Sequence, residues 1–359
     1  MPRAKKRVAV ALSGGVDSAT AAALLKSQGY EVIGLTMQLW DHRSTTPSVG
    51  GRTCCSTEDL YDARRVAQTL DIPFYVINLE ADFKQAVVED FISAYAAGRT
   101  PNPCIRCNQV LKFQLLLSRA LELGAEFLAT GHYARIVEQN GAYQLWRGVD
   151  FSKDQAYFLF AIQRENLARI RFPLGSLTKE QTRSMAEAFG LHLARKRESQ
   201  DVCFVPDGDY AAFFAREGER GCTPGPIIDE SGRQLGTHKG LGSYTIGQRH
   251  GLGVSAAHPL YVTAIQPVLN CLVVGPATAL LCTDFEVEKL NWLDQNPLIE
   301  PMPILAQIRY ASPPWSAVVT PLGENRARVV FDTPQRAIAP GQACVFYVGE
   351  RILGGGWIL

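Results

Sequence analysis

Short apolar runs alternate with amphipathic segments along the first 130 residues. The runs are rich in β-branched residues and too short for helices, and they lie at 8–12, 31–37, 73–78 and 127–130. The segments between them carry apolar residues at helical spacing, at 17–26, 57–70, 83–97 and 104–123. This alternation predicts a parallel β-sheet with helices on both faces, whose ligands bind at the carboxyl ends of the strands.

A different pattern begins at about residue 222, where Gly and Pro recur every few residues and helical periodicity ends. Short β-branched runs dominate there, for example at 272–274, 327–331 and 343–348. We expect two small β-barrels or sandwiches in this part. The predicted domains are an α/β domain at 1–210, a small, mostly β central domain at 211–280 and a C-terminal β-barrel at 281–359.

Two local signals lie between these halves. Asn140-Gly141 separates two short alternating runs and predicts a β-hairpin turn. Thr178 and Gln181 have the spacing of a capping box, and Gly190 marks the end of the helix that the box begins.

Composition narrows the class of protein. Nearly half of the 359 residues are apolar and the net charge is +1, as expected for two or three globular domains. A near-neutral chain does not exclude nucleic acid as a partner, because Lys and Arg can gather on one face. The basic residues at 3–7 precede too few apolar residues for a secretory signal, and no run approaches the roughly 18 apolar residues of a membrane helix. We expect a cytoplasmic protein.

The turn after the first predicted strand carries the clearest chemistry. Gly14 and Gly15 let successive backbone N–H groups point at one spot, and Ser13 and Ser18 add hydroxyl donors at a helix start. Such a turn binds phosphate, but no Lys follows the glycines as it does in the loop that holds a transferable γ-phosphate. The string S-G-G-x-D-S resembles the PP-loop of ATP pyrophosphatases, which grip the departing pyrophosphate. Asp17 is then a candidate Mg²⁺ ligand, or alternatively a helix N-cap.

The nine cysteines favour reactive or metal-binding thiols over a disulfide framework. Cys104 and Cys107 form a C-x-x-C pair at a predicted helix start with Arg106 and Lys112 nearby, and Cys203 follows the basic run 195–197. Three interpretations stay open. Cys107 and Cys203 are a redox or sulfur-transfer pair, the three thiols hold a metal or iron–sulfur cluster, or each thiol is a small buried apolar group.

The remaining cysteines give weaker signals. Those in the β-rich part are predicted to pack in cores, and they are Cys222, Cys271, Cys282 and Cys344. The adjacent pair Cys54-Cys55 lies in a predicted polar loop and is assigned no role.

Several strings, in order along nearly the whole chain, resemble the tRNA-specific 2-thiouridylases, the MnmA or TrmU family. They are Ser13 to Ser18, Gly98 to Pro103 with Cys107-Asn108, Thr130 to Tyr133, Lys153-Asp154-Gln155, Cys203-Phe204, Gly247-Gln248-Arg249, Arg309-Tyr310 and Pro340-Gly341-Gln342. The resemblance implies a PP-loop catalytic domain of the adenine nucleotide alpha hydrolase type, a small central domain and a C-terminal β-barrel.

The resemblance also implies a reaction. ATP adenylates the C2 oxygen of the wobble uridine of a tRNA and releases pyrophosphate. A persulfide on Cys203 supplies sulfur, Cys107 is the second catalytic thiol, and a disulfide between them is left behind. The cofactors are ATP and Mg²⁺, with an iron–sulfur cluster as an alternative. The partners are tRNAs, those for Lys, Glu and Gln, and a sulfur-donor protein such as a cysteine desulfurase or a relay protein.

Further site residues follow from the same resemblance, position by position. ATP is expected to contact Ala11, Leu12, Ser13, Gly14, Gly15, Val16, Asp17, Ser18, Met37 and Gly131. The target base is expected to contact Asn102, Pro103 and Cys104, after it leaves the anticodon stack. Other tRNA contacts are expected from His132, Lys153, Asp154, Gln155, Arg309, Tyr310 and Gln342.

One position departs from the family pattern, since many members carry Asp where this chain has Cys104. A third thiol beside the reacting pair could be a resolving thiol, a cluster ligand or a neutral replacement. Two other functions also stay open. One is a different PP-loop activity, such as a tRNA-modifying ligase that needs no thiol, and the other is an iron–sulfur or nucleotide-gated tRNA-binding protein.

Overall fold

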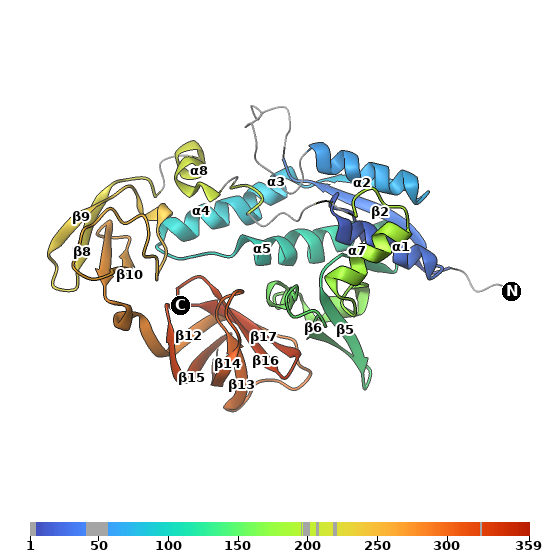
Figure 1. The fold of residues 1–359 in the computed structure, drawn as a ribbon. Helices are drawn as coiled ribbons and strands as arrows, with labels where there is room; N and C mark the ends of the chain where they lie inside the picture. Colours follow the sequence, from blue (N-terminus) through green and yellow to red (C-terminus); the bar gives the residue numbers. More distant parts are fainter. Residues whose placement is uncertain are drawn as a thin grey trace.

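The structure is a computed structural model that describes residues 5–40, 57–194, 196, 202–205, 208–217, 221–323 and 325–359 (Figure 1). Its first sheet is parallel and has the spatial order β3-β2-β1-β4-β7. The strands are β1 (Arg7–Ala11), β2 (Glu31–Gln38), β3 (Phe74–Asn78), β4 (Phe127–Ala129) and β7 (Ile170–Arg171). The predicted parallel sheet is confirmed, and the short edge strand β7 is an addition to it.

The strands β1 and β4 are buried on both faces, as their unbroken apolar runs predict, whereas the edge strand β3 exposes Tyr75 and Val76. Val8 and Val10 of β1 pack in one core with the helices α1 (Val16–Ser27), α2 (Thr57–Thr69) and α7 (Lys179–Ala188). Ala9 points to the opposite core, with the helical segment that begins at Pro103. The capping box at the start of α7 is present, with Thr178 and Gln181 as its two members.

Two of the predicted helices contain π-helical stretches. The first segment consists of α3 (Glu80–Phe83), η1 (Lys84–Val88) and α4 (Glu89–Ala96), and the second of α5 (Pro103–Arg106), η2 (Cys107–Leu116) and α6 (Leu117–Glu122). The stretches η1 and η2 are π-helical, where regular α-helix was expected. Such stretches are rare and often lie at functional sites. The segments η3 (Ala156–Leu159), η4 (Arg164–Arg169) and α8 (Tyr210–Glu217) follow.

The central part is a separate small sheet with the order β10-β11-β8-β9. Its elements are β8 (Gly225–Asp229), β9 (Gln234–His238), η6 (Leu241–Ser243), β10 (Tyr261–Gln266) and β11 (Cys271–Gly275), and η7 (Ala277–Leu280) leads out of it. It has its own small core, which includes Ile227, Val262 and Leu272. One of the two expected small β-units is therefore an open sheet.

The C-terminal strands close into an antiparallel barrel. They are β12 (Leu281–Trp292), β13 (Met302–Gln307), β14 (Trp315–Gly323), β15 (Arg326–Arg336), β16 (Ala343–Val348) and β17 (Arg351–Ile358), and β12 pairs with β17 to complete the ring. The predicted hairpin of β5 (Ala134–Gln139) and β6 (Ala142–Arg147) is confirmed, and β6 pairs with β17. A core that includes Leu145, Tyr157 and Val345 joins the first sheet to the barrel. In the described part of the chain, no helix is both long enough and apolar enough to cross a membrane.

Candidate active site

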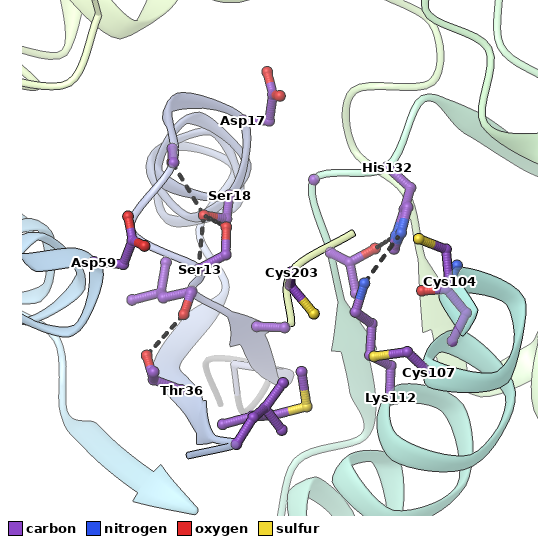
Figure 2. Close-up of a pocket in the computed structure, with 18 of the residues that line it drawn as sticks. Ser13, Asp17, Ser18, Thr36, Asp59, Cys104, Cys107, Lys112, His132 and Cys203 are labelled. Carbon is purple, nitrogen blue, oxygen red and sulfur yellow. Dashed lines mark hydrogen bonds between the residues drawn. The ribbon is translucent and has the colours of Figure 1, made fainter. Parts of the chain in front are cut away.

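A cavity of about 420 Å³ opens at the carboxyl ends of β1, β2 and β4 (Figure 2). This is the edge of the sheet at which ligands were expected to bind. Many of the sequence-predicted residues line it, namely Ala11, Leu12, Ser13, Gly15, Val16, Asp17, Ser18, Met37, Pro103, Cys104, Cys107, Gly131, His132, Gln155 and Cys203. The cavity therefore brings the glycine turn together with three cysteines that come from two distant segments.

The glycine turn has the form expected of a phosphate-binding loop. Gly15 is the N-cap of α1, so the N-terminus of this helix lies at the cavity. Ser18 Oγ accepts a hydrogen bond from Ser13 N at 3.1 Å and donates one to Gly15 O at 3.1 Å. Gly14 has a φ of +70°, and a Cβ there would come within 2.3 Å of Asp59 O. Only glycine fits at this point of the turn, because both the backbone conformation and the space require it.

Lys196 lines the cavity and holds the turn in place, which the sequence did not predict. Its ammonium donates hydrogen bonds to Gly14 O at 3.0 Å, Asp59 Oδ1 at 2.8 Å and Asp62 Oδ2 at 2.6 Å. Burial alone lowers the pKa of Lys196, but its hydrogen bonds to the two carboxylates and their negative charges outweigh this effect, so the pKa lies above its usual range. We had expected the basic run that contains Lys196 to act on Cys203, and Arg195 and Arg197 of this run lie outside the described residues.

Asp17 is held by a second lysine. Its carboxylate accepts hydrogen bonds from Lys179 Nζ at 2.7 Å and 2.9 Å and from the Tyr133 hydroxyl at 3.0 Å. The alternative prediction that Asp17 is the helix N-cap is wrong, because Gly15 occupies that position. Asp17 also lines the cavity.

The side chains around the cavity decide which metal ions could bind there. Among the described residues, no three His, Cys, Asp or Glu side chains gather closely enough to hold a metal ion. Mg²⁺ carried on nucleotide phosphates needs no such group, because one or two protein carboxylates suffice. An iron–sulfur cluster held by Cys104, Cys107 and Cys203 requires the thiolates to converge on one point, and the described residues do not fit it.

Gly131 lies against the start of α1. A Cβ at this residue would come within 2.7 Å of both the carbonyl carbon of Asp17 and the backbone nitrogen of Ser18. The absence of a side chain thus lets the end of β4 pack directly on the phosphate-binding turn. This contact explains the glycine by packing, alongside its position in the cavity.

The C-x-x-C pair lies at the start of a continuous helical segment. Asn102 is its N-cap, and Asn102 Oδ1 accepts a hydrogen bond from Ile105 N at 3.3 Å. Cys104 lies in the first turn and is exposed, whereas Cys107 lies one turn further in and is half-buried. The predicted helix start at this pair is confirmed, and Cys104 is the closer of the two thiols to the N-terminus.

Cys203 reaches the same cavity from the other side (Figure 2). Cys107 and Cys203 both pack against one core, which we call the aromatic cluster. It includes Phe83, Phe91, Phe204, Phe213 and Phe214 together with aliphatic residues such as Leu39, Leu111 and Val205. The fold therefore brings together two half-buried thiols that are almost a hundred residues apart in the sequence.

A neutral histidine and a lysine complete this side of the cavity. Lys112 Nζ lies 3.5 Å from His132 Nε2, and His132 Nδ1 lies 2.7 Å from Thr130 Oγ1. The ammonium can only donate, so Nε2 accepts and the imidazole proton is on Nδ1. Burial, and then the charge of Lys112, lowers the pKa of His132 well below its usual value. His132 is therefore uncharged at neutral pH, while Lys112 supplies the positive charge.

The loop at 98–103 is held by the barrel. Thr100 N donates a hydrogen bond to Pro340 O at 2.7 Å, and Gln342 Nε2 donates one to Thr100 O at 3.0 Å. Gln342 does not line the cavity. In this structure it positions the loop that leads to residues 102–104.

The string Lys153-Asp154-Gln155 divides into different environments. Asp154 is buried, and its carboxylate accepts hydrogen bonds from Arg147 Nε at 2.6 Å and from the backbone nitrogens of Gly148 and Ala156. This geometry favours a structural role for Asp154 over the tRNA contact that the family resemblance implied. Gln155 lines the cavity, and Lys153 is half-buried outside it.

Arg309 and Tyr310 are exposed on the barrel, just after β13. The ring of Tyr310 lies 4.5 Å from that of Phe158, and Phe158 lines the cavity. These two residues thus lie on a surface that continues from the barrel toward the cavity.

The other cysteines are partly as expected. Cys271 and Cys344 are buried in cores, and Cys222 packs half-buried against the aromatic cluster. The prediction is wrong for Cys282, which is exposed on β12 because its side chain lies on the outer face of the barrel strand and donates a hydrogen bond to Asp284 O. Cys54-Cys55 lie outside the described residues.

The fold and the cavity define a class. A parallel sheet with a phosphate-binding turn after β1, followed by a small β-sheet and a closed β-barrel, is the architecture of a PP-loop nucleotide-binding protein with two added β-domains. Family models match in the same order: a tRNA methyl transferase HUP domain at 6–207, a tRNA methyl transferase PRC-barrel domain at 213–276 and an aminomethyltransferase β-barrel domain at 282–358.

Curated relatives make the assignment specific. The chain is 61% identical to the tRNA-specific 2-thiouridylase MnmA of Magnetococcus marinus, over 99% of both chains. It is 49% identical to that of Geobacter metallireducens, over 99% of this chain and 97% of the relative. A solved 4-thiouridine synthetase bound to RNA and ATP aligns at 15% identity with a TM-score of 0.35, over 55% of this chain and 45% of that one, which adds nothing to the assignment. The chain belongs to the family of tRNA-specific 2-thiouridylases, MnmA.

Proposed function

We propose that this protein catalyses the ATP-dependent 2-thiolation of the wobble uridine of tRNA. The products are 2-thiouridine, AMP and pyrophosphate. One observation carries the proposal: the phosphate-binding turn, Cys107 and Cys203 all line a single cavity. Exchange of oxygen for sulfur needs both an activated oxygen and a sulfur nucleophile, and the cavity offers a site for each.

The nucleotide is proposed to bind at the turn. The backbone N–H groups at the N-terminus of α1, with the hydroxyls of Ser13 and Ser18, would hold the pyrophosphate part of ATP. Mg²⁺ arrives with the phosphates as part of the substrate, and Asp17 would hold it. The remaining proposed ATP contacts are Ala11, Leu12, Gly14, Gly15, Val16, Met37 and Gly131.

The target base is proposed to enter beside Asn102, Pro103 and Cys104, next to the thiols. Its C2 oxygen attacks the α-phosphorus of ATP, and pyrophosphate leaves. The terminal sulfur of a Cys203 persulfide then attacks C2, and AMP leaves with the oxygen. The Cys107 thiolate attacks Cys203 Sγ, which releases the sulfur to the base and forms a Cys107–Cys203 disulfide.

The tRNA body is proposed to lie across the barrel. Arg309 and Tyr310 are exposed there, and Lys153 and His132 continue this surface toward the cavity. A sulfur-donor protein with a reactive persulfide would charge Cys203 before each turnover. Because phosphate contacts dominate tRNA affinity, binding should weaken steeply as salt concentration rises.

The experiment separates adenylation from sulfur transfer. Cys107→Ser and Cys203→Ser are assayed for tRNA-dependent pyrophosphate release and for 2-thiouridine in the tRNA. Both variants should release pyrophosphate and make no 2-thiouridine, whereas Cys282→Ser, an exposed barrel position, should match the unaltered protein. Normal 2-thiouridine formation by either variant would contradict the proposed roles, and tRNA-dependent product without either thiol would instead favour a PP-loop ligase.

A further inference from the structure

We propose that Cys104 is a resolving thiol that moves the disulfide left by each turnover from Cys107–Cys203 to Cys104–Cys107. This inference rests on the proposed function, which supplies the first disulfide. It assigns Cys104 a catalytic role in regenerating Cys203, in addition to its place beside the target base.

The helix places Cys104 and Cys107 at a distance suited to a disulfide. The two residues are three positions apart, and the backbone is helical from Pro103 through Cys107. Helical geometry sets their Cα atoms about 5 Å apart. Disulfides usually span Cα separations of about 4.4–6.8 Å. The separation of the two Cα atoms therefore lies within the range of a disulfide, and rotation of the side chains would bring the sulfurs together.

Cys107 is the thiol that can form a disulfide with either Cys203 or Cys104. It packs against the aromatic cluster together with Cys203, and it lies one helical turn from Cys104. All three cysteines line the same cavity. An attack by Cys104 on Cys107 Sγ therefore takes place within one site and needs no further segment to move in.

The different exposure of the three thiols explains why the disulfide would move to Cys104. All three thiols line the cavity, but Cys107 and Cys203 are half-buried there, whereas Cys104 is exposed. A protein reductant must reach a sulfur atom directly in order to attack it. A disulfide that includes Cys104 presents such an atom, and a disulfide between the other two thiols is shielded.

The exchange balances. The Cys104 thiolate attacks Cys107 Sγ, the bond between Cys107 and Cys203 breaks, and Cys203 leaves as a thiolate that can receive the next sulfur. A dithiol reductant then attacks Cys104 Sγ and returns two electrons to the pair, becoming a disulfide itself. The Lys112 ammonium lines the same cavity and electrostatically favours the thiolate forms.

The first test follows the disulfide. The whole protein is charged with polysulfide, desalted, and allowed one turnover with tRNA and ATP without reductant, and its thiols are then alkylated and mapped by mass spectrometry. We expect one mole of Cys104–Cys107 disulfide for each mole of 2-thiouridine formed, and we expect Cys203 to be alkylated. In Cys104→Ser, the Cys107–Cys203 disulfide should accumulate instead. Persistence of Cys107–Cys203 in the unaltered protein would overturn the proposal.

The second test uses the reductant. For each protein, the steady-state rate with a C-x-x-C protein dithiol is divided by the rate with a small dithiol, so that any effect of the substitution on base binding cancels. We expect this ratio to fall about tenfold in Cys104→Ser, because only the small reagent reaches the shielded disulfide. Cys282→Ser, at an exposed thiol outside the cavity, should keep the ratio of the unaltered protein. An unchanged ratio in Cys104→Ser would overturn the proposal.

The two proposals can fail separately. If 2-thiouridine forms but the disulfide does not migrate, the role of Cys104 is wrong and the proposed function stands. If no 2-thiouridine forms in the unaltered protein with either reductant, both are wrong. Thermal unfolding of Cys104→Ser and Cys104→Ala checks that each variant is folded.

Discussion

Replacement of Lys196 by Met should weaken ATP binding, although the sequence analysis gave Lys196 no part in the phosphate-binding turn. The ammonium donates to Gly14 O within the turn and to Asp59 and Asp62 of α2. The bond to Gly14 O fixes the peptide plane that directs the N–H of Gly15. Without this bond, the turn must be organised by the nucleotide itself.

The magnitude follows from the lost hydrogen bonds. A hydrogen bond to a charged group contributes about 1.5–3 kcal/mol. The side chain of Lys196 is 27% exposed, so solvent replaces part of this. If the turn loses the contribution of one such bond, the Kd for ATP rises about ten- to hundredfold. Removal of the cation also leaves Asp59 and Asp62 facing each other, which lowers stability as well as affinity.

The assay is a titration of the folded protein with ATP and Mg²⁺. Lys196→Met should show the raised Kd, and Lys196→Arg should recover much of the affinity, because its guanidinium can still reach the two carboxylates. Lys84→Met, at an exposed lysine outside the cavity, is the matched control. If Lys196→Met binds ATP as tightly as this control, the turn is not organised by Lys196.

Three other predictions test neighbouring contacts. Gly131→Ala should lower ATP affinity and destabilise the protein by about 1–3 kcal/mol, because its Cβ must push the start of α1 away; thermal melts and ATP titrations measure both. His132 has a lowered pKa, so below pH 6.5 the unfolded chain takes up a proton that the folded chain does not. The protein should therefore lose up to about 1.4 kcal/mol of stability per pH unit from this residue, and denaturant titrations of His132→Asn between pH 7 and 5 should show a shallower loss; equal slopes would contradict this. Asn102→Ala should cost about 1 kcal/mol of stability by removing the N-cap, and Asn102→Asp should retain it, as chemical denaturation would show.

The parts of the fold that were predicted correctly depend on local signals. The strands around residues 8–12 and 31–37, the turn at Asn140-Gly141 and the capping box at Thr178 each depend on residues close together in sequence. Glycine conformation, β-branched side chains and cap hydrogen bonds act at this range. The pattern was therefore sufficient to place the cavity at the carboxyl ends of the strands.

The features that were missed depend on distant contacts or small differences in backbone. The pairing of β6 with β17 joins residues about two hundred positions apart. The residues around Leu145 carry no local signal that identifies Ile352 as its partner. The π-helical stretch that begins at Cys107 has the residue types of an ordinary helix. Lys179 and Lys196 were visible as basic residues, but their carboxylate partners were not.

The difference between local signals and distant contacts also explains which properties of the cysteines could be predicted. The sequence placed Cys104 and Cys107 at a predicted helix start, because the turn formers before them and their spacing are local signals. That Cys203 lines the same cavity depends on the packing of the aromatic cluster, which only the fold defines. The exposure of Cys282 depends on which way the barrel strand faces, a property that its mixed neighbours left open.

The central claim is that ATP bound at the glycine turn activates the C2 oxygen of the tRNA base that the thiols then attack. Oxygen-18 placed at C2 of the wobble uridine tests this most directly, with mass spectrometry of the nucleotide products after one turnover. The account predicts one labelled oxygen in AMP for each 2-thiouridine formed, and none in pyrophosphate. Label released into water, with AMP unlabelled, would contradict it.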